Sequence, residues 1–415
     1  MDEKNQLLLG IDLGKQASQI TCFDRTEYEA VPLGREINGE MVYEFPMALK
    51  WLKASGTWRF PDQEGDGGEE IILDHLLERF QKTSFEAGGH TFQTEMVLER
   101  YLLKLLSAVT QQFPEQRIKH LVITVHDKTP ELTKLLHQVG KKLNLYPERM
   151  SIQNYRLSYM YYAVSQPKEL WLNNVGLFLF NKEELLYSQI TVDIMVGLSV
   201  CRNQNLTNVF DYSMLEEESV DAQYAFVNIA ETAMHKQAVT TLYAQGDAFD
   251  GEWAKEALQK LCNGRRVFRG NNIFTKGACY AARELSGEGK LDQCILLDED
   301  MITANVSLRV YHEAQMQDVV LAKAGSLWEE VDASVDVIPD KEYEIQIAVQ
   351  DVIKHQTKIH MLSLSGFQGR ENKTTRFTVR VRFSNRETAV ITLKDNGFGE
   401  ISPTSNRIWE RCIRL

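Results

Sequence analysis

Residues 7–24 read LLLGIDLGKQASQITCFD, and this stretch decides which fold the sequence predicts. The apolar run at 7–9 and the β-type run at 18–23 flank a turn that contains glycine, which is the pattern of a β-hairpin. Gly14 permits backbone angles that a side chain would hinder, and it leaves backbone N–H groups open to an anion. Asp12 ends the first strand, where its carboxylate could hold a magnesium ion through water. The alternative to a phosphate- and magnesium-binding loop is a plain buried hairpin. Further landmarks along the chain are needed to distinguish the two.

Length, charge and cysteine content limit the class of protein. The chain has 415 residues, 43% hydrophobic, which is enough for a large core. The net charge of −12 argues against nonspecific nucleic-acid binding, although a local phosphate site stays open. The polar N-terminus is unlike a signal peptide, and no run approaches the roughly 20 apolar residues of a membrane span. The six cysteines form no CxxC pair. We therefore expect a cytoplasmic protein with reduced thiols, no membrane contact and no nucleic-acid partner.

Hydrophobic periodicity predicts the next elements. Apolar residues at helical spacing predict a short helix over 71–81 and a long one over 93–113. A buried strand at 118–125 follows, and then a helix over 130–143 with proline in its first turn. The acidic, glycine-rich loop 62–68 lacks calcium-loop spacing and is interpreted as a solvated turn. His126 and Asp127 are more often a turn and helix cap than an acid–base pair.

Several later segments supply further landmarks. Residues 150–162 read MSIQNYRLSYMYY, and the turn between predicted strands 173–180 and 185–193 reads NKEE. A helix over 215–237 has acids at its start, which suit the helix dipole better than a metal site. A strand at 238–244 leads through Gly246 and Asp247 into a helix over 251–262. The last predicted helix, 272–286, carries small residues on one side that would permit close backbone packing: Gly277, Ala278, Ala281 and Ala282.

These segments occur in the order found in the actin, sugar-kinase and heat-shock-chaperone ATPase superfamily. The first stretch resembles its first phosphate loop, G-I-D-L-G-T-T-x-S, above all in a diverged bacterial branch of the DnaK-type chaperones, with Lys15 and Gln16 in place of two threonines. The resemblance implies a two-lobed α/β fold of the actin-like (ribonuclease H-like) ATPase type. The first lobe would span residues 1–165 and the second 166–293, with helix 272–286 packing back toward the first lobe.

The same resemblance implies a nucleotide site between the lobes. ATP or ADP would lie between the first loop and the adenosine loop at 246–247, with Mg²⁺ near Asp12 and Lys15 in contact with a phosphate as a point charge. A loop that leads into a helix N-terminus can face a nucleotide even though Asp247 replaces the family's second glycine. The residues implied to bind the cofactor are Asp12, Gly14, Lys15, Gln16, Ser18, Gly246 and Asp247.

The second phosphate loop departs from the family pattern. The family has D-x-G-G-G-T there, whereas this chain has Asn181, Lys182, Glu183 and Glu184. Adjacent carboxylates repel phosphate oxygens at close range, and backbone amides approach a phosphate less freely without glycine. We therefore expect weak or absent ATP hydrolysis and name no catalytic residue.

The chain changes character after residue 293. Residues 294–303 resemble the apolar linker of the chaperones, and a buried edge strand is an equally good local interpretation. From 304 to 415, period-two alternation predicts an antiparallel β-sandwich. It resembles the chaperone substrate-binding β-domain without a helical lid, which implies a protein or peptide partner. Arg376, Arg380 and Arg382 form a basic stripe, usually a solvated face and otherwise a surface for acidic partners.

Three functional hypotheses follow. The first is a chaperone-like nucleotide-binding protein in which cleft closure is coupled to the β-domain. The second is a pseudo-ATPase scaffold that keeps the fold without binding nucleotide. The third, a small-molecule kinase, is weaker because Asn181 cannot take a proton from a substrate hydroxyl.

Overall fold

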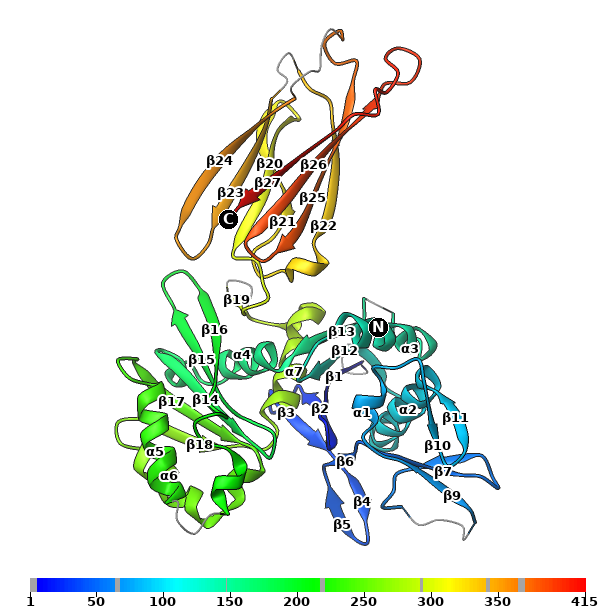
Figure 1. The fold of residues 1–415 in the computed structure, drawn as a ribbon, viewed down its shortest axis with the longest axis vertical. Helices are drawn as coiled ribbons and strands as arrows, with labels where there is room; N and C mark the ends of the chain where they lie inside the picture. The colour runs from blue at the N-terminus through cyan, green and yellow to red at the C-terminus, as the bar shows by residue number, and fades with distance from the viewer. Residues whose placement is uncertain are drawn as a thin grey trace. The chain divides into compact units, whose positions relative to one another are not determined.

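The chain divides into two compact units. The computed structural model describes residues 6–63, 68–146, 148–216, 221–291, 294–340, 344–364 and 370–415. Unit 1 comprises residues 1–192 and 203–293, and unit 2 comprises residues 193–202 and 294–415. In Figure 1 the blue-to-green part of the ribbon is almost all unit 1, and the yellow-to-red strands belong to unit 2.

The first lobe of unit 1 is built on a sheet with β1 at its centre. Its strands run in the order β13-β12-β1-β2-β3, with bounds Met150–Asn154, Arg117–Val125, Gln6–Leu13, Ala17–Asp24 and Glu29–Leu33, and β6 (Phe45–Pro46) pairs with β2. β1 pairs antiparallel with β2, which confirms the predicted hairpin, and parallel with β12. Two amphipathic helices, α2 (Thr94–Gln112) and α3 (Pro130–Lys142), bury their apolar faces on this sheet.

The other side of β1 is covered by α7 (Ile273–Arg283), which also packs on α4 (Tyr155–Ser165). Glycine is required at two of these contacts. A Cβ on Gly10 would lie 2.4 Å from the Cys279 nitrogen, and one on Gly277 would lie 1.8 Å from the Ser158 carbonyl oxygen. Backbones therefore touch directly at both points. This packing holds Tyr155, the first residue of α4, at the edge of the sheet.

The second lobe of unit 1 is built on β14 and its neighbours. The strand order is β18-β17-β14-β15, with bounds Arg266–Arg269, Val239–Gln245, Asn174–Phe180 and Leu185–Asp193. β14 pairs antiparallel with β15 and parallel with β17. Two helices, α5 (Ala222–Ala233) and α6 (Glu252–Leu261), share an aromatic-rich core with this sheet. The turn between β14 and β15 is the NKEE segment.

Short strands complete the first lobe: β4 (Arg35–Ile37), β5 (Glu40–Val42), β7 (Leu49–Leu52), β8 (Thr57–Arg59), β9 (Glu70–Leu73), β10 (Ser84–Ala87) and β11 (His90–Gln93). The predicted helix over 71–81 is wrong in its first half. β9 pairs with β7 and buries every second residue, and only α1 (Leu76–Arg79) is helical. The alternating burial of residues 70–73 is that of a strand, although the same apolar residues also fit a helical pattern. In the acidic loop, Asp62 pairs with Arg35, and residues 64–67 lie outside the described ranges.

The predicted helix over 215–237 is shorter than expected. α5 begins after Asp221, whose carboxylate accepts a hydrogen bond from the Tyr224 N–H at 2.9 Å. This N-cap agrees with the expectation that the acids there serve the helix start. Glu217 and Glu218 lie outside the described residues.

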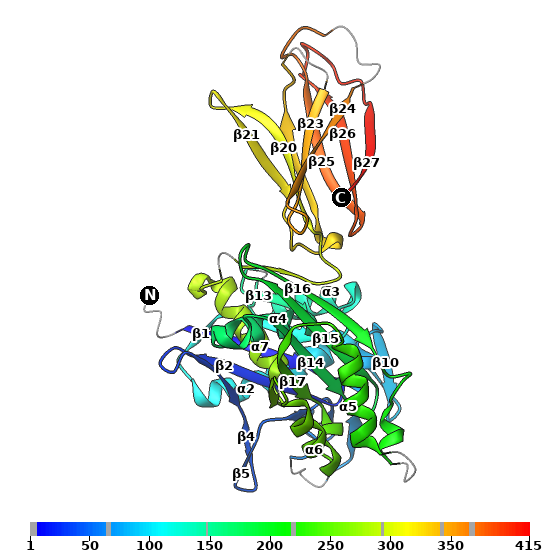
Figure 2. The same cartoon turned by 90° about the vertical axis from the view of Figure 1, so that its left-hand side faces the viewer.

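Unit 2 consists mainly of two antiparallel four-stranded sheets (Figure 2). One has the order β21-β20-β23-β24, with bounds Gln315–Ala322, Ala304–His312, Glu344–Asp351 and Gln356–Ser363. The other has the order β22-β25-β26-β27, with bounds Asp332–Val337, Arg376–Asn385, Thr388–Gly397 and Ile408–Arg414. Both sheets contribute alternate side chains to one hydrophobic core.

Residues 294–303 are not only a linker. Ile295–Leu297 form β19, which pairs in parallel with the start of β16 (Leu198–Asn205). This pairing accounts for the assignment of residues 193–202 to unit 2. The edge-strand interpretation of this segment is therefore the better one, because backbone pairing with a distant strand satisfies its polar groups.

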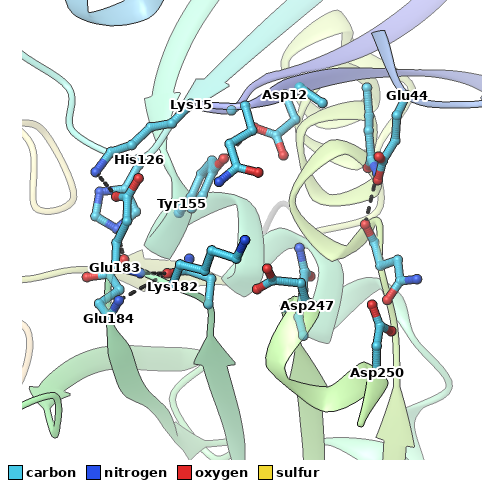
Figure 3. Close-up of a pocket in the computed structure, with 18 residues that line it drawn as sticks. Asp12, Lys15, Glu44, His126, Tyr155, Lys182, Glu183, Glu184, Asp247 and Asp250 are labelled. Atoms are coloured by element: carbon cyan, nitrogen blue, oxygen red, sulfur yellow. Dashed lines mark hydrogen bonds and ion pairs between the residues drawn. The ribbon is translucent and has the colours of Figure 1, made fainter. Parts of the chain in front are cut away.

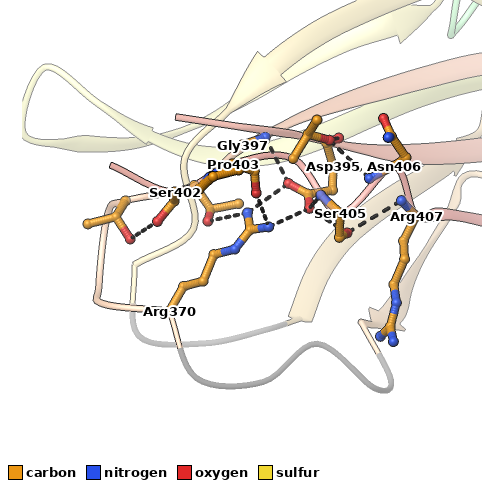
Figure 4. Close-up of polar contacts among 11 residues, drawn as sticks. Arg370, Asp395, Gly397, Ser402, Pro403, Ser405, Asn406 and Arg407 are labelled. Atoms are coloured by element: carbon orange, nitrogen blue, oxygen red, sulfur yellow. Dashed lines mark hydrogen bonds and ion pairs between the residues drawn. The ribbon is translucent and has the colours of Figure 1, made fainter. Parts of the chain in front are cut away.

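A buried carboxylate organises the loop between β26 and β27 (Figure 4). Asp395 is fully buried and accepts hydrogen bonds from both terminal nitrogens of Arg370, at 3.0 and 2.9 Å. It also accepts from the Ser405 and Gly397 backbone N–H groups, both at 2.8 Å. Burial alone would raise the pKa of Asp395, but the hydrogen bonds from Ser405 and Arg370 outweigh it and hold the pKa at about 2.

Candidate functional site: a cleft in unit 1

The cleft lies between the two lobes of unit 1 and encloses about 340 Å³ (Figure 3). It is bordered by the β1–β2 turn, the segment after β12, the start of α4, the β14–β15 turn and the loop after β17. Six of the seven residues that the resemblance implied line it: Asp12, Gly14, Lys15, Gln16, Gly246 and Asp247. The structure thus brings together residues more than 200 positions apart in the sequence.

Ser18 is the predicted site residue that does not reach the cleft. It is fully buried on β2 and accepts a hydrogen bond from the Tyr101 hydroxyl at 2.8 Å, within the first-lobe core. Successive side chains on a strand point to opposite faces, and Ser18 occupies the core-facing position. The structure therefore does not bring Ser18 together with the other predicted site residues.

Asp12 is a buried carboxylate at the end of β1. It is 8% exposed and accepts a hydrogen bond from the Tyr155 hydroxyl at 2.7 Å. Burial raises the pKa of Asp12 to about 7, against the opposing effects of Tyr155 and of the charge on His126. The Tyr155 ring is in turn stacked on Phe274 of α7, with centroids 3.9 Å apart. The tyrosine that donates to Asp12 is therefore itself held by α7.

Among the described residues, Asp12 does not belong to a metal site built from three or more protein side chains. Nowhere in the described ranges does a group of three or more His, Cys, Asp or Glu side chains converge. Mg²⁺ is commonly bound by one or two carboxylates together with substrate phosphates and water. Asp12 fits such a role only where phosphate oxygens complete the coordination.

Lys15 forms an ion pair across the cleft with Glu183 of the β14–β15 turn. The hydrogen bond to Glu183 is the main reason that the pKa of Lys15 is raised. Both side chains are about two-fifths exposed, so water screens the pair. Lys15, which we expected to contact a phosphate, is thus paired with a carboxylate of the opposite lobe.

The β14–β15 turn satisfies its own backbone. The Asn181 side-chain oxygen accepts hydrogen bonds from the N–H groups of Glu183 at 2.9 Å and Glu184 at 3.0 Å. In a phosphate loop, N–H groups at this place would face the ligand. Here the asparagine takes them, which forms an Asx turn and presents two carboxylates to the cleft.

His126 contributes a second contact across the cleft. It follows β12, and its Nε2 lies 2.5 Å from a carboxylate oxygen of Glu184, while its Nδ1 lies 3.0 Å from Asp127. Burial lowers the pKa of His126, but the hydrogen bond and charge of Glu184, followed by Asp127, raise it to about 9. The helix cap expected here is instead Thr129, whose hydroxyl accepts from the Leu132 N–H at 3.2 Å. Sequence reasoning noted His126 but had no signal for its pairing with Glu184.

Gly246 has a packing role. It adopts a φ of 118°, and a Cβ there would lie 2.0 Å from the Phe180 carbonyl oxygen. Glycine is therefore required where this loop crosses the end of β14. The neighbouring Asp247 adds an acid to a cleft in which carboxylates outnumber basic groups. The acids are Asp12, Glu44, Glu183, Glu184, Asp247 and Asp250, and the basic groups are Lys15, Lys182 and His126.

In unit 2, the predicted basic stripe is largely neutralised. Arg380 is paired with Asp332, and Arg376 lies 3.7 Å from Asp336, both acids of the neighbouring β22. Cross-strand pairs of opposite charge are a common feature of a solvated sheet face. This surface offers little unpaired charge to an acidic partner.

Comparison with protein families gives two matches. Residues 34–299 match the C-terminal model of a family of unknown function, DUF5716, and residues 301–415 match a domain of unknown function, DUF8552. A search of the curated proteins gave no match. None of the helices in the described ranges is long and apolar enough to cross a membrane. Because the first match covers more than half of the chain, this protein belongs to the DUF5716 family.

Proposed function

We propose that this protein is an actin-like, DnaK-related member of the superfamily whose cleft does not hydrolyse ATP, and that it acts as a cytoplasmic scaffold. In this proposal the lobes of unit 1 are held together by side chains, and the β-domain of unit 2 binds a protein partner. Six free cysteines, several of them buried, support a reducing compartment.

The β14–β15 turn is the observation that carries the proposal. Its N–H groups are bonded to Asn181, and Glu183 holds Lys15. A nucleotide's terminal phosphates would meet two carboxylates here, whereas hydrolysis requires donors and cations that stabilise the developing charge. These contacts would have to break before a triphosphate could bind productively.

A nucleotide-operated switch is the second candidate. It is favoured by a cavity of about 340 Å³ that contains both Asp12 and Lys15, within the range of ligand pockets. In this case the phosphates would displace Glu183 from Lys15, and lobe closure would depend on nucleotide.

Titration calorimetry with ATP and ADP, with and without Mg²⁺, separates the two candidates. For the scaffold we expect no binding by the natural protein at about 1 mM nucleotide. The double variant Glu183→Gln, Glu184→Gln removes the repelling charges and frees Lys15. If those acids alone exclude phosphate, this variant gains binding, whereas Glu44→Gln, which removes another acid of the same cavity, does not.

Micromolar, magnesium-dependent binding by the natural protein, lost in Asp12→Ala, would contradict the scaffold proposal and support the switch. Circular dichroism of each variant establishes that it is folded.

A further inference from the structure

One margin of the β-sandwich in unit 2 is formed by β24, the outermost orange strand in Figure 1. This strand has eight residues, contains no proline, and pairs with β23 alone among the described strands. Its far side therefore presents backbone N–H and C=O groups that can pair with another extended chain.

Basic side chains gather at this margin. Lys358 and His360 pair in register with Val349 and Ile347, which belong to the core, so both point to the core side of the sheet. Arg411 of β27 pairs with buried Ile391 and also points to the core side of its own sheet. Burial lowers the pKa of His360, and the positive charges of Lys358 and Arg411 lower it further.

These basic groups lack acidic partners. Within the described part of the chain, neither Lys358 nor Arg411 forms an ion pair, and the buried Nε2 of His360 has no hydrogen-bond partner. Arg376 and Arg380 of β25 differ, because Asp336 and Asp332 of the neighbouring strand pair with them. Two cations without an ion pair, Lys358 and Arg411, thus point to the core side of the sandwich, and Lys358 belongs to its outermost strand β24.

Apolar side chains alternate with the basic ones along β24. Leu362 is buried next to His360 in the inward row, and Ile359 and Met361 are 49% and 43% exposed on the outer face. An added strand would place its alternate side chains against these two rows.

We propose that β24 binds an extended acidic segment of a partner protein by strand addition, with its carboxylates directed at Lys358, His360 and Arg411. Main-chain hydrogen bonds would supply affinity, and the charges would select acidic over basic sequences. This inference names the partner class for the β-domain of the proposed scaffold and rests on that function.

The test uses fluorescence anisotropy of the full chain with a labelled peptide as long as β24, in which glutamate and valine alternate. We expect saturable binding, no binding of the analogue with lysine in place of glutamate, and no binding of a peptide N-methylated on its pairing edge. The double variant Lys358→Glu, Arg411→Glu should weaken binding at least about tenfold. The matched control Arg376→Glu, Arg382→Glu reverses two charges on the other sheet and should leave affinity unchanged.

Three results would each overturn the proposal: no binding of the acidic peptide to the natural protein, equal binding of the lysine analogue, or unchanged binding after N-methylation. None of them depends on the cleft of unit 1. Failure of strand addition is therefore distinguishable from failure of the scaffold proposal, which nucleotide titration tests.

Discussion

At the scale of the residue, the environment of a side chain decides what its chemistry can be. Asp12 and Asp395 are both buried carboxylates, yet their pKa values move in opposite directions. Asp395 accepts hydrogen bonds from an arginine and two backbone N–H groups, whereas Asp12 has a tyrosine hydroxyl as its hydrogen-bond donor. Donor number and charge, rather than burial alone, separate a stable anion from a carboxyl group that holds its proton.

Asp12→Asn should stabilise the protein at neutral and higher pH. Because the pKa of Asp12 is higher in the folded state than its usual 3.8, its contribution to stability is fully present below about pH 4 and is lost as the pH rises through about 7. Asparagine stays neutral and can still accept from Tyr155. The rise in pKa corresponds to about 4 kcal/mol, an upper bound for the gain at about pH 8. Urea unfolding across this pH range measures it.

Glu44→Gln is the control for this experiment, because Glu44 is an exposed acid of the same cavity. A variant Asp12→Asn that loses stability at high pH would show that the carboxylate is favourable in the folded state.

At the scale of the element, one turn of the second lobe makes both ion pairs that cross the cleft of unit 1. Lys15 pairs with Glu183 and His126 with Glu184, and both acids belong to the β14–β15 turn. The first-lobe residues of the two pairs lie on different elements. Lys15 belongs to the β1–β2 turn, and His126 directly follows β12. Movement of the turn would therefore break both contacts together.

The His126–Glu184 pair makes a prediction for titration by nuclear magnetic resonance. The imidazole of His126 should titrate with a pKa of about 9, and Glu184→Gln should lower that pKa toward its ordinary value near 6.5. Since the folded pKa is the higher one, the pair stabilises the fold fully below about pH 6.5 and loses this effect as the pH rises through about 9. His120, whose pKa burial lowers, serves as the internal control. Titration of His126 near 6.5 in the natural protein would refute the pairing.

The contact between α4 and α7 makes a second prediction at this scale. Gly277→Ala would place a methyl group 1.8 Å from the Ser158 carbonyl oxygen, so the helices must separate. We expect a loss of about 3 kcal/mol or more in the unfolding free energy of unit 1. Gly68→Ala is the matched control, because its nearest neighbour would be 3.9 Å away. Equal stability of the two variants in denaturant unfolding would contradict the close packing.

At the scale of the whole molecule, unit 2 has a hydrophobic core of its own. Every buried member of that core lies between Ile302 and Ile413. Both four-stranded sheets are complete within residues 301–415, the range that also matches a separate domain family. The strand β19 differs, because its partner strand β16 lies far from it in the sequence and outside residues 301–415.

A fragment of residues 301–415 should therefore fold alone. We expect a β-type circular dichroism spectrum and one cooperative unfolding transition in denaturant, as for a small single domain. In a longer fragment starting at 294, the amides of 295–297 should exchange rapidly, because β16 is missing. A fragment without a cooperative transition would show that the sandwich needs the rest of the chain.

The sequence by itself determined the local structure and the order of the elements. Residues 7–24 form the predicted hairpin, and the helices expected over 93–113 and 130–143 are α2 and α3, since their apolar spacing matches the helical period over many residues. The apolar pattern over 71–81 is too short to separate the helical from the strand period, and pairing with β7 makes its first half a strand. Composition and turn chemistry also identified the NKEE turn as unlike a phosphate loop.

Only the tertiary structure decided what the cleft residues do. The sequence predicts Ser18 in the site, but the alternation of side chains along β2 turns Ser18 to Tyr101 in the core. Lys15 and Glu183 are 168 positions apart, and no local pattern indicates that they meet. Their pairing depends on how the backbones of α4, α7 and β1 approach one another, which fixes the separation of the lobes. Long-range packing therefore determined that the cation beside the first loop faces a carboxylate.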